Sequence, residues 1–540
     1  MNNPIGSLVD SLLQETVQTS LGRFSPELAV CATILALLFV RLFNLDRRLP
    51  AHWVALFGAL TAFAFAYVQF FDLRRGAAQP ETFFTGLLIY DQFTVFFRLF
   101  LLLFAILVIA LTALSGIPDN EDGPDFYTLL LGSIVGMLLM VSTNHLLILF
   151  LAVEMASVPS YVMVGFLKGR RQSSEASLKF VVYGAGAAGV MLYGTSLLAG
   201  LVGTADLTEL AARLNTLLGS SDVTMSSAEV RTVVLALMMV MIGLAFKLSI
   251  VPFHFWCPDA FEGASAEVAG FLSVASKAAA FALLVRFSLA FVGDQAGVLS
   301  KVYLSLGVGL GVIAAVTATF GNLAAYAQTN MKRLLAYSTI AHAGYMLMPV
   351  GALMVLLNAP QGTQLDIPFE ATRCLEGLMY YLFVYLFMNL GAFAIVALIR
   401  NEIFSEDIDD YNGLAQQTPV LCVCMAVCLF SLIGMPPLGG FWAKVFILVP
   451  VWSAGQIHWS MYVVVCVALL NTVFSLFYYI RVLRAMFLTP RAEQARTVVP
   501  QFATSAYVVL VSLPILLLGI FIEGLSQTAH SVASFLIPIP

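Results

Sequence analysis

Four of the seven lysines in this sequence stand in or at the ends of long apolar stretches, where a charged side chain is costly. They are Lys179, Lys247, Lys277 and Lys444. A lysine at the centre of a membrane helix costs roughly 2.5–3.5 kcal/mol on insertion scales, so each position needs a reason. Lysine can lose its proton when it is buried, whereas arginine effectively cannot. These lysines are therefore suited to carrying protons.

The stretch GLAFKLSIVPFHFW combines Lys247 with Pro252 and His254. Glu154, in ILFLAVEMASVPSYVMVGF, is the obvious counter-charge, and Pro159 follows it closely. A proline removes the helical hydrogen bond to the carbonyl four residues earlier, and the loosened backbone beside the charge admits water. A static ion pair would not need this feature. The pattern therefore predicts a proton-transfer site at Glu154 and Lys247.

The energies are compatible with a switch at this pair. Two unit charges about 4 Å apart, at an effective dielectric constant near 20, attract each other by roughly 4 kcal/mol. Moving one charge against 100 mV takes about 2.3 kcal/mol. Closing the Glu154–Lys247 pair would therefore hold a proton on the lysine, and opening the pair would release it.

Each candidate also has a structural alternative, which for Lys247 and Lys444 is a fixed ion pair. Lys179 follows Glu175 by one helical turn near the end of its stretch, so it could simply extend its ammonium toward water. Lys277 is flanked by small residues in LSVASKAAAF, which favours a functional role. His254 and His342 are either proton stations or partners in hydrogen bonds between helices.

The composition indicates that helices in a membrane position these residues. Of the 540 residues, 60% are hydrophobic and 11% are charged, with a mean hydropathy of +0.93, whereas soluble proteins carry about 25% charged residues. A spanning helix needs about 20 apolar residues. We therefore predict an all-α polytopic membrane protein with about 14 transmembrane helices. The predicted spans are 27–44, 52–71, 91–114, 126–142, 145–167, 176–202, 229–253, 265–289, 299–322, 333–353, 376–399, 420–449, 459–487 and 502–523.

No linker divides the chain, so residues 1–540 are predicted to form a single membrane domain. Weak similarity between two parts of the sequence indicates two five-helix repeats, at 126–289 and 299–487. They are flanked by helices within 27–114 and at 502–523. An odd number of helices per repeat inverts the second copy. Helices 7 and 12 are both predicted to be broken, and Lys247 and Lys444 are expected at corresponding places in them.

The distribution of basic residues between alternate loops predicts the orientation of the chain. The positive-inside bias places the richer set in the cytoplasm and both termini outside. The richer set is Arg47, Arg48, Lys168, Arg170, Arg171, Lys332, Arg333, Arg400, Arg484, Arg491 and Arg496. The opposing set is Arg74, Arg75, Arg213, Arg231, Lys301 and Arg373.

Other chemistries find little support in the sequence. The cysteines at 422, 424 and 428 match no zinc or iron–sulfur spacing, so small buried apolar residues are the better interpretation. The formal net charge of −5 argues against nucleic acid as a partner. The sequence contains no nucleotide-binding fingerprint either.

Three long segments carry a family resemblance. GLAFKLSIVPFHFWCPDAFEGA, NMKRLLAYSTIAHAGYML and SLIGMPPLGGFWAKVF together resemble the proton-translocating, antiporter-like membrane subunits of respiratory complex I, which are related to subunits of Mrp-type sodium/proton antiporters. The similarity covers nearly the whole chain, and the segments come in the family's order.

The resemblance implies that Glu154, Lys179, Lys247, His254, Lys277 and Lys444 form the polar axis of a proton-pumping NADH–quinone oxidoreductase subunit. Protons would pass from the cytoplasm to Lys247 and Lys277, cross by His254 and water to Lys444, and leave outside. FMN, iron–sulfur clusters and quinone would belong to partner subunits, with no cofactor on this chain. The resemblance also implies the inner membrane of a bacterium and assembly with the other membrane and peripheral subunits.

One segment departs from the family pattern. The family usually has two prolines at the start of the eighth helix, where this chain reads GASAEVAGF with Ser265 and Glu267. We expect this helix to begin more regularly. Glu267 would either join the proton-uptake path or face water.

Two other functions stay open at this point. An Mrp-type antiporter subunit would exchange sodium for protons without redox partners. A purely structural membrane scaffold would tolerate neutral replacements of all four lysines.

Overall fold

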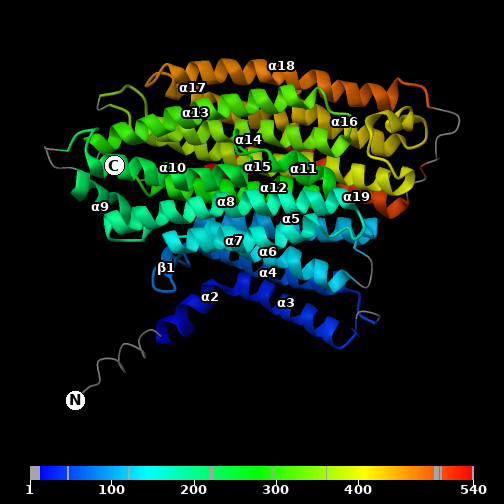
Figure 1. Cartoon of the computed structure of the whole chain (residues 1–540), viewed down its shortest axis with the longest axis horizontal. Helices are drawn as coiled ribbons and strands as arrows, with labels where there is room; N and C mark the ends of the chain where they lie inside the picture. The colour runs from blue at the N-terminus through cyan, green and yellow to red at the C-terminus, as the bar shows by residue number, and fades with distance from the viewer. Residues whose placement is uncertain are drawn as a thin grey trace.

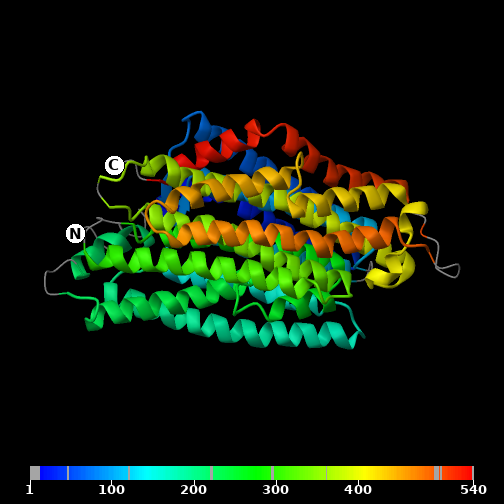
Figure 2. The same ribbon diagram turned by 90° about the horizontal axis from the view of Figure 1, so that it is seen from above.

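Long helices lie side by side and roughly parallel in the computed structural model (Figure 1, Figure 2). The structure describes residues 13–45, 48–118, 122–218, 223–292, 297–360, 362–491, 498 and 501–537. Within them, 13 helices are long and apolar enough to cross a membrane, or up to 14 if a bent pair counts as one span. This number agrees with the fourteen predicted spans, and the all-α membrane fold is confirmed.

The helices follow the predicted spans closely at most positions. The long ones are α3 (Ser25–Leu42), α4 (Ala51–Arg74), α5 (Gln92–Ser115), α6 (Gly123–Ser142), α7 (Leu146–Val164), α8 (Arg171–Val202), α10 (Ala228–Leu248), α12 (Ala266–Leu289), α13 (Val298–Ala325), α14 (Met331–Leu356), α15 (Ile367–Ile403), α18 (Ser460–Phe487) and α19 (Phe502–Ile520). The shorter ones are α2 (Leu21–Arg23), α9 (Leu207–Leu218), α11 (Trp256–Gly263), α16 (Pro419–Ile433), α17 (Gly439–Ala454) and α20 (Glu523–Ser534).

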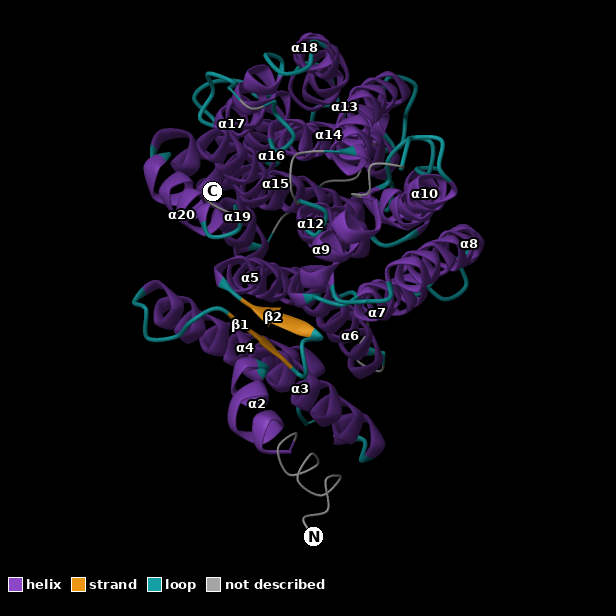
Figure 3. Cartoon of the chain, turned by 90° about the vertical axis from the view of Figure 1, so that its left-hand side faces the viewer, coloured by secondary structure: helices purple, strands orange, loops and turns teal. Residues whose placement is uncertain are grey.

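Helices α3 and α4 lie at one end of the cross-section, next to a hairpin that the sequence does not predict (Figure 3). The antiparallel strands β1 (Glu81–Phe83) and β2 (Leu88–Tyr90) form this hairpin. Arg98 of α5 binds Glu27 of α3 through atoms 2.7 Å apart, and both side chains are fully buried. This ion pair ties the N-terminal helices to the rest of the bundle.

Three helices near the middle of the cross-section, α12, α14 and α15, are almost completely enclosed by other helices (Figure 3). The apolar part of each is 94–100% buried inside the protein. Polar side chains on these helices therefore contact protein and not lipid, which is the setting in which polar groups are tolerated at membrane depth.

Two segments predicted as broken spans end a helix at membrane depth. Helix α10 ends at Leu248, where Ser249 adopts a left-handed conformation with φ 57°, and α11 begins at Trp256. Helix α16 ends at Ile433, where Gly434 has φ 91°, and α17 begins at Gly439. Each break exposes the last carbonyl groups of the helix before it, which have no partner within that helix.

Lys247 and Lys444, which are expected at corresponding places in the two repeats, lie on opposite sides of their helix breaks. Lys247 is the penultimate residue of α10, before its break, whereas Lys444 lies in α17, after the break. The break follows Lys247 and precedes Lys444, and the correspondence of the two lysines between the repeats stays a prediction. The two inverted repeats stay a prediction, and the predicted loop residues Arg47 and Arg496 lie outside the described residues.

Candidate functional site

Glu154 and Lys277 each lie close enough to Lys247 for their charges to act on it. Lys247 is buried, with 3% of its surface exposed, and Glu154 is half-buried on α7. Among the described residues, no ion pair within 4 Å joins Glu154 to Lys247, and no hydrogen bond holds the Lys247 ammonium. The pair stands open in this structure.

Lys277 sits against the end of the broken helix α10. Its Nζ donates to the carbonyl of Leu248 at 3.2 Å and to Ser249 Oγ at 2.9 Å. The ammonium also lies 5.8 Å from the centre of the Trp256 ring. Lys277 is fully buried, and no carboxylate contacts it in the described part of the chain. The break in α10 therefore supplies the polar atoms that hold this cation.

Lys444 is held in a similar way by α16. Its Nζ donates to the carbonyl of Ile433, the last residue of α16, at 2.7 Å, and to Thr472 Oγ1 of α18 at 3.4 Å. The ammonium lies 4.7 Å from the centre of the Tyr345 ring. Gly434 keeps space for this side chain, because an added Cβ would lie 3.0 Å from the lysine Cδ.

Helix α15 carries a row of polar side chains between these two lysines. Tyr381, Tyr385 and Asn389 follow one another at intervals of four residues, so they share one face of the helix. Asn389 donates to Ser273 of α12 at 2.5 Å, one turn before Lys277. The Tyr385 hydroxyl donates to Thr339 Oγ1 of α14 at 3.1 Å.

His342 of α14 continues this row toward Lys444. Its Nδ1 lies 2.7 Å from the Tyr381 hydroxyl, and its Nε2 lies 3.4 Å from the Tyr479 hydroxyl of α18. The Tyr479 hydroxyl also hydrogen-bonds Ser338. Tyr345, whose ring faces Lys444, is one turn along the same helix. The imidazole can accept a proton at one nitrogen and release one at the other.

His254 and Lys179 lie elsewhere, around a polar pocket of about 250 Å³ that is also lined by Asp259 and Arg333. His254 packs between Phe255 and Phe320, with ring centres 4.5 and 4.4 Å away. Its Nδ1 is buried and has no hydrogen-bond partner in the part of the chain that is described. His254 thus lies at this pocket, and no hydrogen bond or ring contact joins it to His342 or Lys444 in the described residues.

Lys179 takes part in an ion-pair network at the mouth of this pocket. Its ammonium lies 2.9 Å from both Glu175 and Asp259, and Arg333 bridges Asp259 at 2.8 Å and Glu262 at 2.5 Å. Lys179 is 42% exposed. Lys179 is therefore held by two ion pairs, and its role in a relay stays a prediction.

Glu267 is buried, with 1% of its surface exposed, so it does not face water. Its helix begins regularly, because Ser265 caps α12 by accepting the Val268 amide at 3.4 Å. The charge of Glu267 acts on Lys332, which is paired with Glu406 at 2.9 Å and donates to the Ala264 carbonyl.

The polar face of α15 is not among the predictions from the sequence. Its signal is visible in LMYYLFVYLFMNLG, where Tyr381, Tyr385 and Asn389 interrupt an apolar run at helical spacing. Tyrosine and asparagine also serve as ordinary interhelical hydrogen-bonding residues, so the spacing alone does not distinguish the two roles.

The fold and these contacts define a class of protein. Buried lysines, a histidine and hydroxyl groups lie on long apolar helices of the bundle, several of them joined by hydrogen bonds, which suits the passage of protons through a membrane. In the described residues, no group of three or more His, Cys, Asp or Glu residues is arranged to hold a metal ion. The arrangement is that of a polytopic ion-translocating membrane protein.

Comparisons with known proteins identify the family. A profile described as NADH:quinone oxidoreductase/Mrp antiporter, TM, matches residues 143–471. NADH-quinone oxidoreductase subunit N of Anaeromyxobacter sp. (strain Fw109-5) is 39% identical over 94% of this chain and 96% of its own length. The protein of the same name from Chlorobium chlorochromatii (strain CaD3) is 33% identical over 98% of both chains. The chain therefore belongs to this family of membrane subunits, as the three sequence segments indicate.

Two solved structures agree with this assignment. A chain of respiratory complex I from Thermus thermophilus, solved with bound aureothin, is 28% identical and superposes with a TM-score of 0.71 over 93% of this chain and 98% of its own. A chain of the Mrp complex from Dietzia sp. DQ12-45-1b gives a TM-score of 0.78 at 20% identity, covering 96% of this chain and 98% of its own. The second comparison shows a shared fold.

Proposed function

We propose that protons cross this chain along the buried row from Lys247 and Lys277 to Lys444. The chain is a proton-translocating membrane subunit of an NADH–quinone oxidoreductase, and its partners are other subunits of that complex. FMN, iron–sulfur clusters and quinone are bound by those partner subunits. The bacterial inner membrane holds the complex, with both termini of this chain on the outer side.

The observation that carries the proposal is the way Lys277 and Lys444 are held. Each ammonium binds the last carbonyl of a broken helix, and no carboxylate pairs with either within the described residues. A carbonyl dipole stabilises an ammonium less than a full negative charge does, so the proton can be released without breaking an ion pair.

Between the two lysines, the proton path uses His342 and the hydroxyl groups of α15 and α18 in place of the expected His254. This route is supported by the hydrogen bonds of His342 to Tyr381 and Tyr479. His254 and Lys179 instead belong to the uptake side, where their pocket contains Asp259 and Arg333.

Energy from electron transfer reaches the path at Glu154. This carboxylate is half-buried on α7, and its charge acts on Lys247. A charge change beside Glu154 closes or opens its pair with Lys247 and so holds the proton or sends it toward Lys277.

The repeated contact between a lysine and a broken helix also supports two inverted repeats at 126–289 and 299–487.

The test measures proton pumping and NADH-driven electron transfer in membranes whose assembled complex carries Lys247→Ala. Lys168→Ala is the matched control, because Lys168 is 78% exposed and pairs with Asp122 in a loop. We expect both activities to fall in Lys247→Ala and to persist in the control. If both persist in Lys247→Ala, Lys247 is structural and the proposed path is wrong at its first step.

The same membranes distinguish the antiporter alternative. We expect proton pumping that depends on an electron donor and not on sodium. Sodium-driven proton exchange without an electron donor would instead favour an Mrp-type antiporter subunit.

A further inference from the structure

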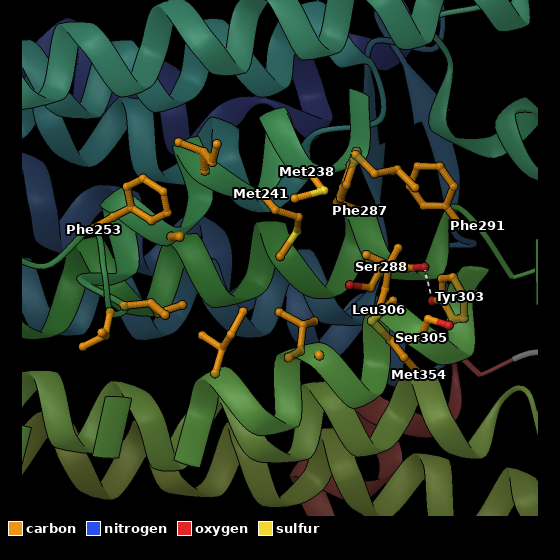
Figure 4. A pocket seen from close by; sticks show the side chains of 18 of the residues that line it. Met238, Met241, Phe253, Phe287, Ser288, Phe291, Tyr303, Ser305, Leu306 and Met354 are labelled. Carbon is orange, nitrogen blue, oxygen red and sulfur yellow. Dashed lines mark hydrogen bonds between the residues drawn. The ribbon is translucent and has the colours of Figure 1, made fainter. Parts of the chain in front are cut away.

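An apolar cavity of about 300 Å³ lies between α10, α12 and α13, with Phe253 at one end and Phe291 at the other (Figure 4). Its walls include Met238 and Met241 of α10 and Leu306 of α13. An enclosed apolar cavity of about 150 Å³ holds a benzene ring, so this cavity has room for a longer hydrocarbon. The proton path described above does not use it.

The mouth of the cavity opens on the outer surface of the chain. Met238 of α10 and Ile313 of α13 line the cavity and are 55% and 40% exposed. Both helices are membrane spans, so the medium at this mouth is the hydrocarbon of the bilayer. The chemical group available to fill the cavity is therefore an acyl chain.

Polar groups of the lining gather at the end where α13 begins. The Tyr303 hydroxyl donates to the Ser288 carbonyl there (Figure 4). The Ser305 hydroxyl donates to the Lys301 carbonyl at 2.8 Å. This end of the cavity thus faces the region of lipid headgroups, and the opposite end, at Phe253, lies at the break after α10.

Two exposed basic residues lie on α10 and α13 beyond the lining residues, toward the same end of the cavity. Lys301 precedes the lining residues Ser305 and Gly309 by four and eight residues, and Arg231 precedes Met238 by seven. At helical spacing, each cation lies on the face of its helix that lines the cavity. Together they present positive charge to an anionic headgroup whose acyl chain runs inward between α10 and α13.

We propose that this cavity binds one acyl chain of an anionic phospholipid, with the phosphate near Arg231 and Lys301. Inside the cavity, the acyl chain reaches Ile250, Val251 and Pro252, the residues that follow Leu248 and Ser249. It thereby packs the lipid side of the break whose other side binds Lys277. The lipid keeps this break dry on its outer face.

The probe is phosphatidylglycerol with a photoreactive diazirine in its acyl chain, incorporated with the whole purified complex into phosphatidylcholine nanodiscs. After irradiation, mass spectrometry identifies the labelled peptides of this chain. We expect label on peptides that contain Met238, Met241 and Leu306. Absence of label from these peptides would overturn the proposal, and label on a neighbouring subunit's helix at this mouth would identify that subunit as the occupant instead.

A filling variant tests whether the label reports the cavity. Gly309 lines it, and an added Cβ there meets no atom within 4 Å, so Gly309→Phe would occupy the space of the acyl chain. Gly309→Ala is the matched control, since one methyl group leaves most of the volume. We expect the label to be lost in Gly309→Phe and kept in Gly309→Ala. Equal labelling of both variants would contradict the proposal.

The headgroup is tested with Arg231→Gln and Lys301→Gln. A basic residue near an anionic membrane surface contributes about 1 kcal/mol, so labelling by phosphatidylglycerol should fall about fivefold for each variant. A photoreactive phosphatidylcholine with the same acyl chain should label weakly and be insensitive to both changes. Equal labelling by the two lipids would overturn the proposal that the site selects an anionic headgroup. Since no readout uses pumping, this test is independent of the proton path.

Discussion

The ammonium of Lys277 donates to the carbonyl of Leu248, 3.2 Å away, at the end of α10. Lys444 repeats this contact at Ile433, the end of α16, at 2.7 Å. The last carbonyls of a helix lack partners within the helix and form the negative end of its dipole, so both positions attract a cation. The two breaks therefore create cation sites at membrane depth that require no carboxylate.

The first prediction concerns the need for a releasable proton at Lys277. Lys277→Arg keeps the positive charge at the Leu248 carbonyl, but a guanidinium does not deprotonate. We expect proton pumping to fall to the background level in both Lys277→Arg and Lys277→Ala, measured in membrane vesicles energised with NADH. Normal pumping by Lys277→Arg, with the complex fully assembled, would show that charge alone is required.

A second prediction separates the two histidines. His342 hydrogen-bonds Tyr381 and Tyr479, whereas His254 Nδ1 has no partner among the described residues. His342→Phe should lower the pumping rate by about a hundredfold, the lower end of what a positioned proton-transfer group contributes.

His254→Phe is the comparison, assayed in the same vesicles. It should have the smaller effect, because His254 lies at the uptake pocket beside Lys179 and Asp259, where other polar groups remain. A larger loss of pumping in His254→Phe than in His342→Phe would show that protons pass through His254 and not His342.

The third prediction rests on Gly434, whose φ of 91° is left-handed and whose position faces the Lys444 side chain. Gly434→Ala would add roughly 1–2 kcal/mol of backbone strain and place a methyl group 3.0 Å from the lysine Cδ. We expect reduced pumping with electron transfer reduced in parallel. Gly186→Ala is the control, since that glycine has no atom within 4 Å of an added Cβ and should behave as the unaltered protein.

The fourth prediction concerns stability and not transport. Arg98 and Glu27 are both fully buried, and Arg98 also donates to Gln69 at 3.0 Å. Arg98→Ala leaves a buried unpaired carboxylate and should destabilise the chain by about 3–5 kcal/mol. The effect is measured by heating the purified complex and recording the temperature at which this subunit is lost from it.

The double variant Arg98→Met/Glu27→Leu removes both charges and should recover most of that loss, since well-packed apolar residues often replace a buried ion pair without cost. A double variant as unstable as Arg98→Ala would mean that the charges themselves hold α3 against α5.

The sequence by itself determined the class of the fold and the charged part of the site. Apolar runs of the length of a bilayer predict the spans, and a lysine such as Lys277 is conspicuous within them because its cost there is high. Glycine and proline at the ends of α10 and α16 also predict breaks there, since these residues end helices by local chemistry.

Only the tertiary structure decided which polar groups meet. Tyr385 and Thr339 are 46 residues apart, and Asn389 and Ser273 are 116 apart, yet each pair forms a hydrogen bond because α15 packs against α14 and α12. Likewise, His342 and not His254 meets the row of hydroxyl groups. Helical periodicity identifies the face on which a side chain lies, but the packing of helices distant in sequence determines what that face contacts.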